Sequence, residues 1–170
     1  MKKIYSFVAA LVVAMVVLVS CGASSAYQAQ FDAAKSALEA KDAATAFAKV
    51  KEVIAGDKVT ADDAVICTSL ALQAYALEAQ KAGSAQAIPV EQNLDLCKQV
   101  VAAYNKAKSF PEADVKSAND AVKTLSGTDV MGTAATYVQS VASLEQAIQA
   151  AQQAEAAAAE AEDAEEGEGE

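Results

Sequence analysis

The chain has 170 residues, of which 54% are apolar and 5% aromatic, and its 13 basic residues, all lysine, face 23 acidic ones for a net charge of −10. This length gives room for one ordinary domain, and an acidic chain without arginine lacks the basic surface by which proteins bind nucleic acids. Alanine makes up roughly a quarter of the residues and is the best helix former, so the composition predicts an all-α protein with no nucleic-acid partner.

The N-terminus has the pattern of a secretory signal peptide. Lys2 and Lys3 precede the uncharged run of residues 4–18, which is rich in valine and alanine. A basic segment followed by a short apolar run is typical of an export signal, so we expect residues 1–20 to be cleaved. The run is shorter than the ~20 residues of a membrane-spanning helix, and no charged stop-transfer segment follows it.

The signal peptide ends in Leu18-Val19-Ser20-Cys21, which resembles the lipobox of bacterial lipoproteins. The resemblance implies a diacylglyceryl group on the Cys21 thiol, cleavage between Ser20 and Cys21, and acylation of the new amine by palmitate-type chains. Two or three acyl chains anchor a protein stably where one is marginal. Ordinary cleavage after Ala26 is the alternative, because the three residues ending there are small.

The resemblance also bears on localisation. Gly22 stands where lipoproteins retained in the inner membrane of well-studied Gram-negative bacteria carry aspartate. It therefore implies a cell-envelope protein, lipid-anchored to the outer membrane and facing the periplasm, whereas a Gram-positive source would place it on the plasma membrane. Residues 21–26 are expected to be the lipidated cysteine and a short flexible tether.

Residues 27–154 are expected to form the folded domain, beginning with a helical hairpin. The first helix carries an apolar stripe at helical spacing, made of Tyr27, Phe31, Ala34 and Leu38. Asp42 can cap a second helix, which Gly56 ends with a residue suited to a left-handed backbone. The segment Gln28–Lys58 resembles one tetratricopeptide repeat, with Ala34, Ala46 and Val53 at the close-packing positions and Lys58 where proline is usual.

Two longer helices are expected next. Thr60 and Asp63 form a capping box that opens a third helix, which runs to Gly83. The fourth starts at Pro89 and ends before the Phe110-Pro111 pair. Its apolar stripe is Val90, Leu94, Cys97, Val101 and Tyr104.

The fifth and sixth helices complete the domain. The fifth ends at Gly127 and presents Val115, Ala118, Val122 and Leu125. The sixth begins near Thr133, with a stripe of Tyr137, Val141, Leu144, Ile148 and Ala151, and outlasts its large apolar residues. Residues 155–170 are an Ala/Glu-rich acidic tail, expected to be partly disordered. One hypothesis for the function of this tail is that it binds divalent cations or a basic partner.

These elements predict an all-α fold of about six helices in antiparallel hairpins. The arrangement is either tetratricopeptide-like or an irregular helical domain. The later helices do not repeat at a fixed period, which favours the irregular domain. A solenoid would present a concave groove and a closed bundle would not, and the sequence leaves that choice open.

Cys67 and Cys97 are expected to be free thiols. An exported protein meets oxidising conditions, so a disulfide between them must be considered. If the third and fourth helices form a hairpin, the two residues differ by seven positions along it, an offset of about 10 Å. A disulfide requires Cα atoms within about 7 Å, so both cysteines are predicted to be small packing residues in the core.

Nothing in the sequence predicts catalysis, a cofactor or a metal site. The chain contains no histidine, the commonest general base, and no arginine, the usual clamp for phosphate and carboxylate substrates. The Gly127–Thr133 loop has glycines spaced like a phosphate-binding loop but lacks its lysine. The acidic pairs Asp62-Asp63 and Glu112 with Asp114 lie in first helical turns, where acids are stabilised by the helix dipole.

Two non-catalytic functions fit this pattern. The first is a lipid-anchored module that binds or scaffolds a protein or peptide. A groove lined by Tyr27, Tyr75, Tyr104 or Tyr137 would support it, and the alternative is that all four tyrosines are core residues. The second is a structural envelope protein that self-associates through alanine-rich helices, as in the small murein lipoprotein, although Glu170 stands where that family has its cell-wall-linking lysine. The sequence does not set the oligomeric state.

Overall fold

The computed structural model describes residues 25–166, with side chains through residue 157, and this part contains six α-helices, one 3-10 turn and no strand. The elements are α2 (Gln28–Glu39), α3 (Ala43–Ile54), α4 (Ala61–Lys81), η1 (Ala85–Ala87), α5 (Val90–Lys108), α6 (Glu112–Ser126) and α7 (Val130–Glu166). The all-α class and the hairpin arrangement are confirmed. The expected signal peptide, Ser20 and Cys21 lie outside the described residues.

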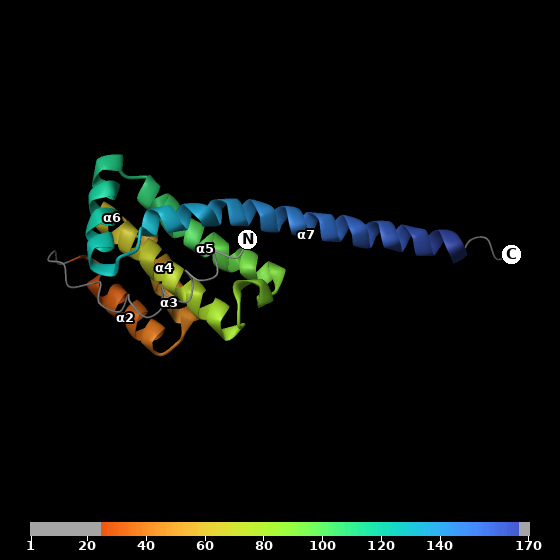
Figure 1. The fold of residues 1–170 in the computed structure, drawn as a ribbon, viewed down its shortest axis with the longest axis horizontal. Helices are drawn as coiled ribbons and strands as arrows, with labels where there is room; N and C mark the ends of the chain where they lie inside the picture. Colours follow the sequence, from red (N-terminus) through yellow and green to blue (C-terminus); the bar gives the residue numbers. More distant parts are fainter. Residues whose placement is uncertain (1–24, 167–170) are drawn as a thin grey trace.

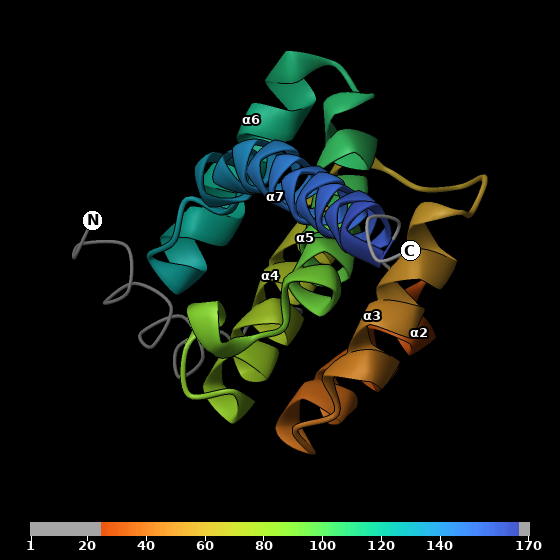
Figure 2. The same cartoon turned by 90° about the vertical axis from the view of Figure 1, so that its right-hand side faces the viewer.

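Helix α4 is the centre of the domain. The α2–α3 hairpin and α5 pack on adjacent sides of it, and α6 and α7 also contact it (Figure 2). Burial therefore surrounds α4 instead of following one stripe, and it includes both large residues such as Leu72 and alanines such as Ala64 and Ala71 that have no exposed surface. Small side chains let neighbouring helices approach closely, which is how the six helices share one core.

Helix α7 packs along α5 and then projects from the body as a single rod (Figure 1). At 1.5 Å per residue its 37 residues span about 55 Å. Leu144 is the last large side chain packed against the core, and residues 149–157 are all exposed. The helix thus outlasts its apolar residues, as expected, and continues through Glu166 into the segment assigned to the acidic tail.

Most of the expected helix caps are present. The Asp42 carboxylate accepts a hydrogen bond from the Thr45 amide at 3.0 Å, and Thr60 and Asp63 form the reciprocal capping box at the start of α4. Gly83 and Gly127 have φ angles of 86° and 73°, the left-handed conformation that glycine adopts without a steric penalty. The caps explain why α3, α4 and α6 have the boundaries that the sequence indicated.

The left-handed conformation predicted for Gly56 is wrong. The left-handed residue near this hairpin is Lys41, with φ of 60°, in the turn between α2 and α3. Gly56 is required for a different reason: a Cβ atom placed on it would overlap the ring and hydroxyl of Tyr27. The residue makes room for an aromatic side chain, which backbone signals in the sequence do not reveal.

The start of the last helix also differs from the prediction. Helix α7 begins at Val130, three residues before the expected Thr133, and the Asp129 side chain caps its first turn. The Asp129 carboxylate accepts hydrogen bonds from the Gly132 amide at 2.9 Å and the Asn119 side chain at 3.0 Å. These two bonds hold the pKa of Asp129 below its usual value. The polar side chain of this loop is therefore used to cap α7.

Two predicted apolar stripes are confirmed in their middle and wrong at one end. Leu94 and Cys97 of α5 and Val115, Ala118 and Val122 of α6 are buried as predicted. Val90 at the start of α5 is 47% exposed and Leu125 at the end of α6 is 49% exposed. The buried face of α5 is centred on Val100 and Ala103, which have no exposed surface. Contact with both α4 and α7 sets this face, so the helix buries small residues that a pattern of large side chains overlooks.

Candidate functional site

The first candidate region is the junction between the N-terminal segment and the body. The Ser25 hydroxyl donates a hydrogen bond of 2.7 Å to Oδ1 of Asp63. Oδ2 of the same carboxylate accepts bonds from the amide and hydroxyl of Thr60, at 3.0 and 2.9 Å. Asp63 is only 3% exposed, so the capping box of α4 also serves as a buried docking point for Ser25.

Tyr27 holds the same junction from the other side. Its hydroxyl accepts a hydrogen bond from the Lys58 amide at 3.2 Å, and its ring lies against Gly56. Ser25 and Tyr27 therefore attach the start of the described chain to α4 and to the α3–α4 loop. Only four residue steps separate Ser25 from Cys21, a distance of at most about 14 Å when the chain is fully extended. Contacts with the body begin at Ser25, two residues before the predicted start of the domain at Tyr27.

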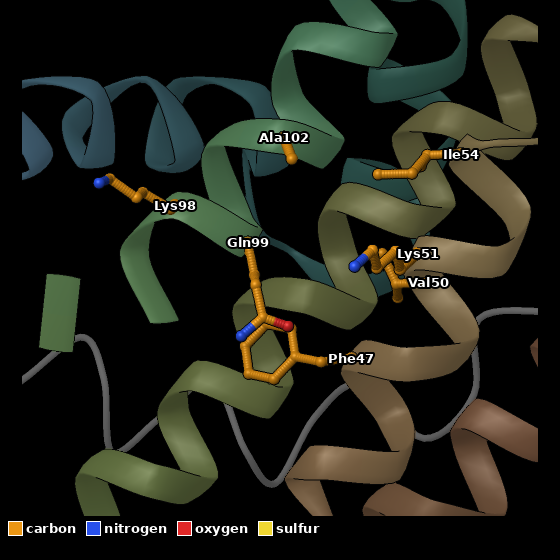
Figure 3. Close-up of a pocket in the computed structure, with 7 residues that line it drawn as sticks. All are labelled: Phe47, Val50, Lys51, Ile54, Lys98, Gln99 and Ala102. Atoms are coloured by element: carbon orange, nitrogen blue, oxygen red, sulfur yellow. The ribbon is translucent and has the colours of Figure 1, made fainter. Parts of the chain in front are cut away.

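The second candidate region is a pocket of about 280 Å³ between α3 and α5 (Figure 3). Phe47, Val50 and Ile54 form its apolar side on α3, and Gln99 and Ala102 face them from α5. Helices α3 and α5 both pack on α4 and contact each other less extensively, which leaves a gap between them. Sequence periodicity did not indicate this pocket, because its residues come from two helices more than forty positions apart.

Two lysines stand at the edge of this pocket, but they differ in their partners. Lys98 Nζ forms a 3.0 Å ion pair with Glu145 of α7, and it points away from the other lining residues in Figure 3. No ion pair engages Lys51 within residues 25–157, and its acidic sequence neighbour Glu52 is held by Lys49 at 2.7 Å. Lys51 is therefore the available positive charge at the pocket.

The expected tyrosine-lined groove is absent from the described structure. Tyr75 is buried and meets the ring of Tyr137 edge-on, with centroids 4.9 Å apart. Tyr27, Tyr104 and Tyr137 are partly buried and pack against the core. The four residues are therefore core or core-edge side chains.

Cys67 and Cys97 are buried free thiols, as expected from their axial offset. Burial raises the pKa of Cys97 to about 11 and raises that of Cys67 further. The Cys97 thiol lies 3.6 Å from Oδ1 of Asn93, which also accepts a 2.9 Å hydrogen bond from the Tyr75 hydroxyl. Both thiols stay protonated at neutral pH, a state that is poorly nucleophilic.

The remaining polar motifs do not converge on a site. Asp62, Glu112 and Asp114 are exposed in the first turns of their helices. Among the residues whose placement is described, no three histidine, cysteine or acidic side chains are grouped as metal ligands. The same part of the chain contains no helix that is long and apolar enough to span a membrane.

Comparison with known proteins found no match to a family model, and no curated protein or solved structure is significantly similar to the chain.

Proposed function

We propose that this chain is a lipid-anchored bacterial cell-envelope protein that acts as a non-catalytic protein-binding or scaffolding module. The anchor is the acylated Cys21 of the lipobox, and the module is the helical domain that follows. In a Gram-negative source the protein faces the periplasm from the outer membrane. No catalytic residue, cofactor or metal is part of the proposal.

The hydrogen bond between Ser25 and Asp63 is the observation that carries this proposal. A residue four positions after the expected lipidation site is bound to a buried carboxylate at the start of the central helix. Such a junction holds the body close to its anchor, because the free span between them is at most about 14 Å. A long unstructured spacer would instead let the domain move far from the membrane.

The direction of α7 fits a module that presents itself away from the membrane. Along the long axis of the molecule, α2 and α7 both begin at the same end, and α7 runs toward the opposite end (Figure 1). An anchor just before α2 would therefore leave the end of α7 farthest from the bilayer. The acidic sequence after residue 154 is repelled by anionic headgroups, which favours the same orientation.

Metabolic labelling with an alkyne-bearing fatty acid in the native bacterium tests the anchor. We expect label on the wild-type chain and none on Cys21→Ala, while Cys67→Ser and Cys97→Ser serve as matched controls that keep it. Retained label on Cys21→Ala would reject the assignment of the anchor. Mild crosslinking and mass spectrometry then test the module: one dominant heterologous partner supports it, and its absence contradicts it.

A self-associating structural protein is the second candidate function. The observation that favours it is the alanine-rich stretch of α7 at residues 149–157, which is exposed along its whole length. Sedimentation of the delipidated protein separates the two functions. An elongated oligomer supports the structural protein, and a monomer supports the binding module.

A further inference from the structure

We propose that the pocket between α3 and α5 is a binding site for a medium-chain carboxylate, a ligand with one apolar chain and one anionic head. This inference goes beyond the proposed function, since neither the anchor nor a protein partner requires it. It depends on the shape of the pocket, on its apolar lining and on the polar groups at its edge.

The volume sets the size of the ligand. About 280 Å³ is below the ~300–1,000 Å³ typical of drug-sized sites, and it equals roughly nine water-sized volumes of ~30 Å³. A chain of eight to ten methylene-sized groups fits that space. A complete phospholipid or a folded peptide segment does not.

The lining sets the chemistry of the chain. Phe47 and Val50 are each 3% exposed and Ile54 is half-buried, so their side chains form a fixed apolar wall on α3. Ala102 on α5 leaves the opposite side open because it is small. The face of an alkyl chain that lies against this wall loses contact with water.

The edge of the pocket sets the charge of the head group. Lys51 extends from α3 into the gap between α3 and α5, and the Gln99 side chain extends from α5 toward α3 (Figure 3). An ammonium and an amide that approach one carboxylate provide charge-assisted and neutral hydrogen bonds. Lys98 contributes less, because Glu145 already holds it.

Calorimetric titration of the full chain with decanoate tests the proposal, with decanol and decyltrimethylammonium as uncharged and cationic probes of equal chain length. We expect saturable binding of one decanoate and at least tenfold weaker binding of both other probes. Octanoate should bind more weakly than decanoate, by about fourfold per methylene removed. Equal affinity for decanol and decanoate would overturn the role of Lys51.

Two variants locate the site without disturbing the core. Ala102→Leu fills the exposed side of the pocket and should weaken decanoate binding at least tenfold, whereas Ala48→Leu, at an exposed α3 position outside the lining, should not. Lys51→Ala should weaken it about tenfold, and Lys123→Ala, an exposed lysine on α6, should not. Absence of saturable decanoate binding, or binding unaffected by Ala102→Leu, would reject the site and leave the labelling test of Cys21 unaffected.

Discussion

The ring of Tyr137 on α7 meets the ring of Tyr75 on α4 edge-on, with their centroids 4.9 Å apart and their planes at 84°. This contact joins the last helix to the central one. Edge-to-face pairs contribute about 0.5–1.5 kcal/mol beyond the area they bury. The pair thus fixes where α7 lies before it leaves the body.

Removal of one ring should destabilise the whole domain. We expect Tyr137→Ala to lower the free energy of unfolding by about 2–4 kcal/mol, from lost burial, a residual cavity and the lost ring contact. Val138→Ala, at an adjacent position that is 43% exposed, should change it by less than about 1 kcal/mol. Urea unfolding followed by circular dichroism measures both, and equal effects would contradict the role given to the ring pair.

The Ser25–Asp63 hydrogen bond should be measurable by a double-mutant cycle. A bond to a charged, buried acceptor contributes about 1.5–3 kcal/mol, so Ser25→Ala should cost about 1–2 kcal/mol in the wild-type chain. In an Asp63→Ala background the same change should cost less, because it then removes only the hydrogen bond that the Ser25 hydroxyl accepts from the Tyr27 amide at 3.0 Å. Ser36→Ala, at an exposed α2 position, is the matched control, and purely additive effects would show that the bond contributes nothing.

Gly56→Ala should destabilise the protein through a steric overlap with the Tyr27 ring, and Tyr27→Leu should relieve that overlap. The added methyl group would overlap the Tyr27 ring and displace it, at a cost of about 1–3 kcal/mol typical of overpacking. In a Tyr27→Leu background the additional effect of Gly56→Ala should fall below about 0.5 kcal/mol. Thermal unfolding of the four variants gives the coupling, and a Gly56→Ala chain as stable as wild type would contradict the close contact.

The raised pKa of Cys97 predicts a loss of stability at alkaline pH. The ordinary thiol pKa is 9.0 and that of folded Cys97 is about 11. The protonated Cys97 thiol contributes fully to the free energy of unfolding below pH 9. This contribution is lost as the pH rises toward 11, because the thiol loses its proton at lower pH in the unfolded chain than in the folded one. Cys97→Ala should therefore show a shallower decline of unfolding free energy between pH 9 and 11 than wild type. Parallel curves would contradict the prediction.

The thiol should also react slowly in the folded state. In a Cys21→Ser, Cys67→Ser chain at pH 8, the raised pKa of Cys97 should keep its thiolate fraction about a hundredfold below that of an ordinary cysteine. Alkylation by iodoacetamide should accordingly be at least about a hundredfold slower in buffer than in concentrated urea. Similar rates in the two conditions would mean that the thiol is exposed.

The projecting part of α7 should be dispensable for the stability of the body. Residues 149–157 are exposed, so a chain that stops after Gln152 should lose helical circular dichroism signal but less than about 0.5 kcal/mol of unfolding free energy. A chain that stops after Gln139 also loses Val141 and Leu144, which pack against the core, and should be destabilised by at least about 2 kcal/mol. Equal stability of the two truncations would contradict this division of α7.

Features determined by neighbouring residues in the chain could be predicted from the sequence. The caps at Asp42 and Thr60 and the glycine that ends α6 are local, because each satisfies backbone groups within one turn of a helix. The free state of Cys67 and Cys97 followed from helix geometry alone. Alanine content and periodicity were sufficient for the all-α class.

Features that depend on distant parts of the chain could not be predicted. The exposure of Val90 and Leu125 and the requirement for glycine at position 56 depend on which helix lies opposite. The pocket could not be predicted because it forms only where Phe47 of α3 and Gln99 of α5 face each other, and that arrangement arises from the packing of both helices on α4. Lys41 adopts a left-handed conformation although lysine has no preference for it, so packing of the α2–α3 hairpin overrides the local cost.

The distribution of charge along the long axis gives the molecule a permanent electric dipole. Every lysine in the sequence precedes Thr124. The charged residues of α7 and of the sequence after it are all acidic. The aligned peptide units of α7 add to this separation, since their negative end also lies at the C-terminus. In the field of a charged surface such a molecule experiences a torque that directs the end of α7 away from negative charge, so its orientation near that surface depends on ionic strength.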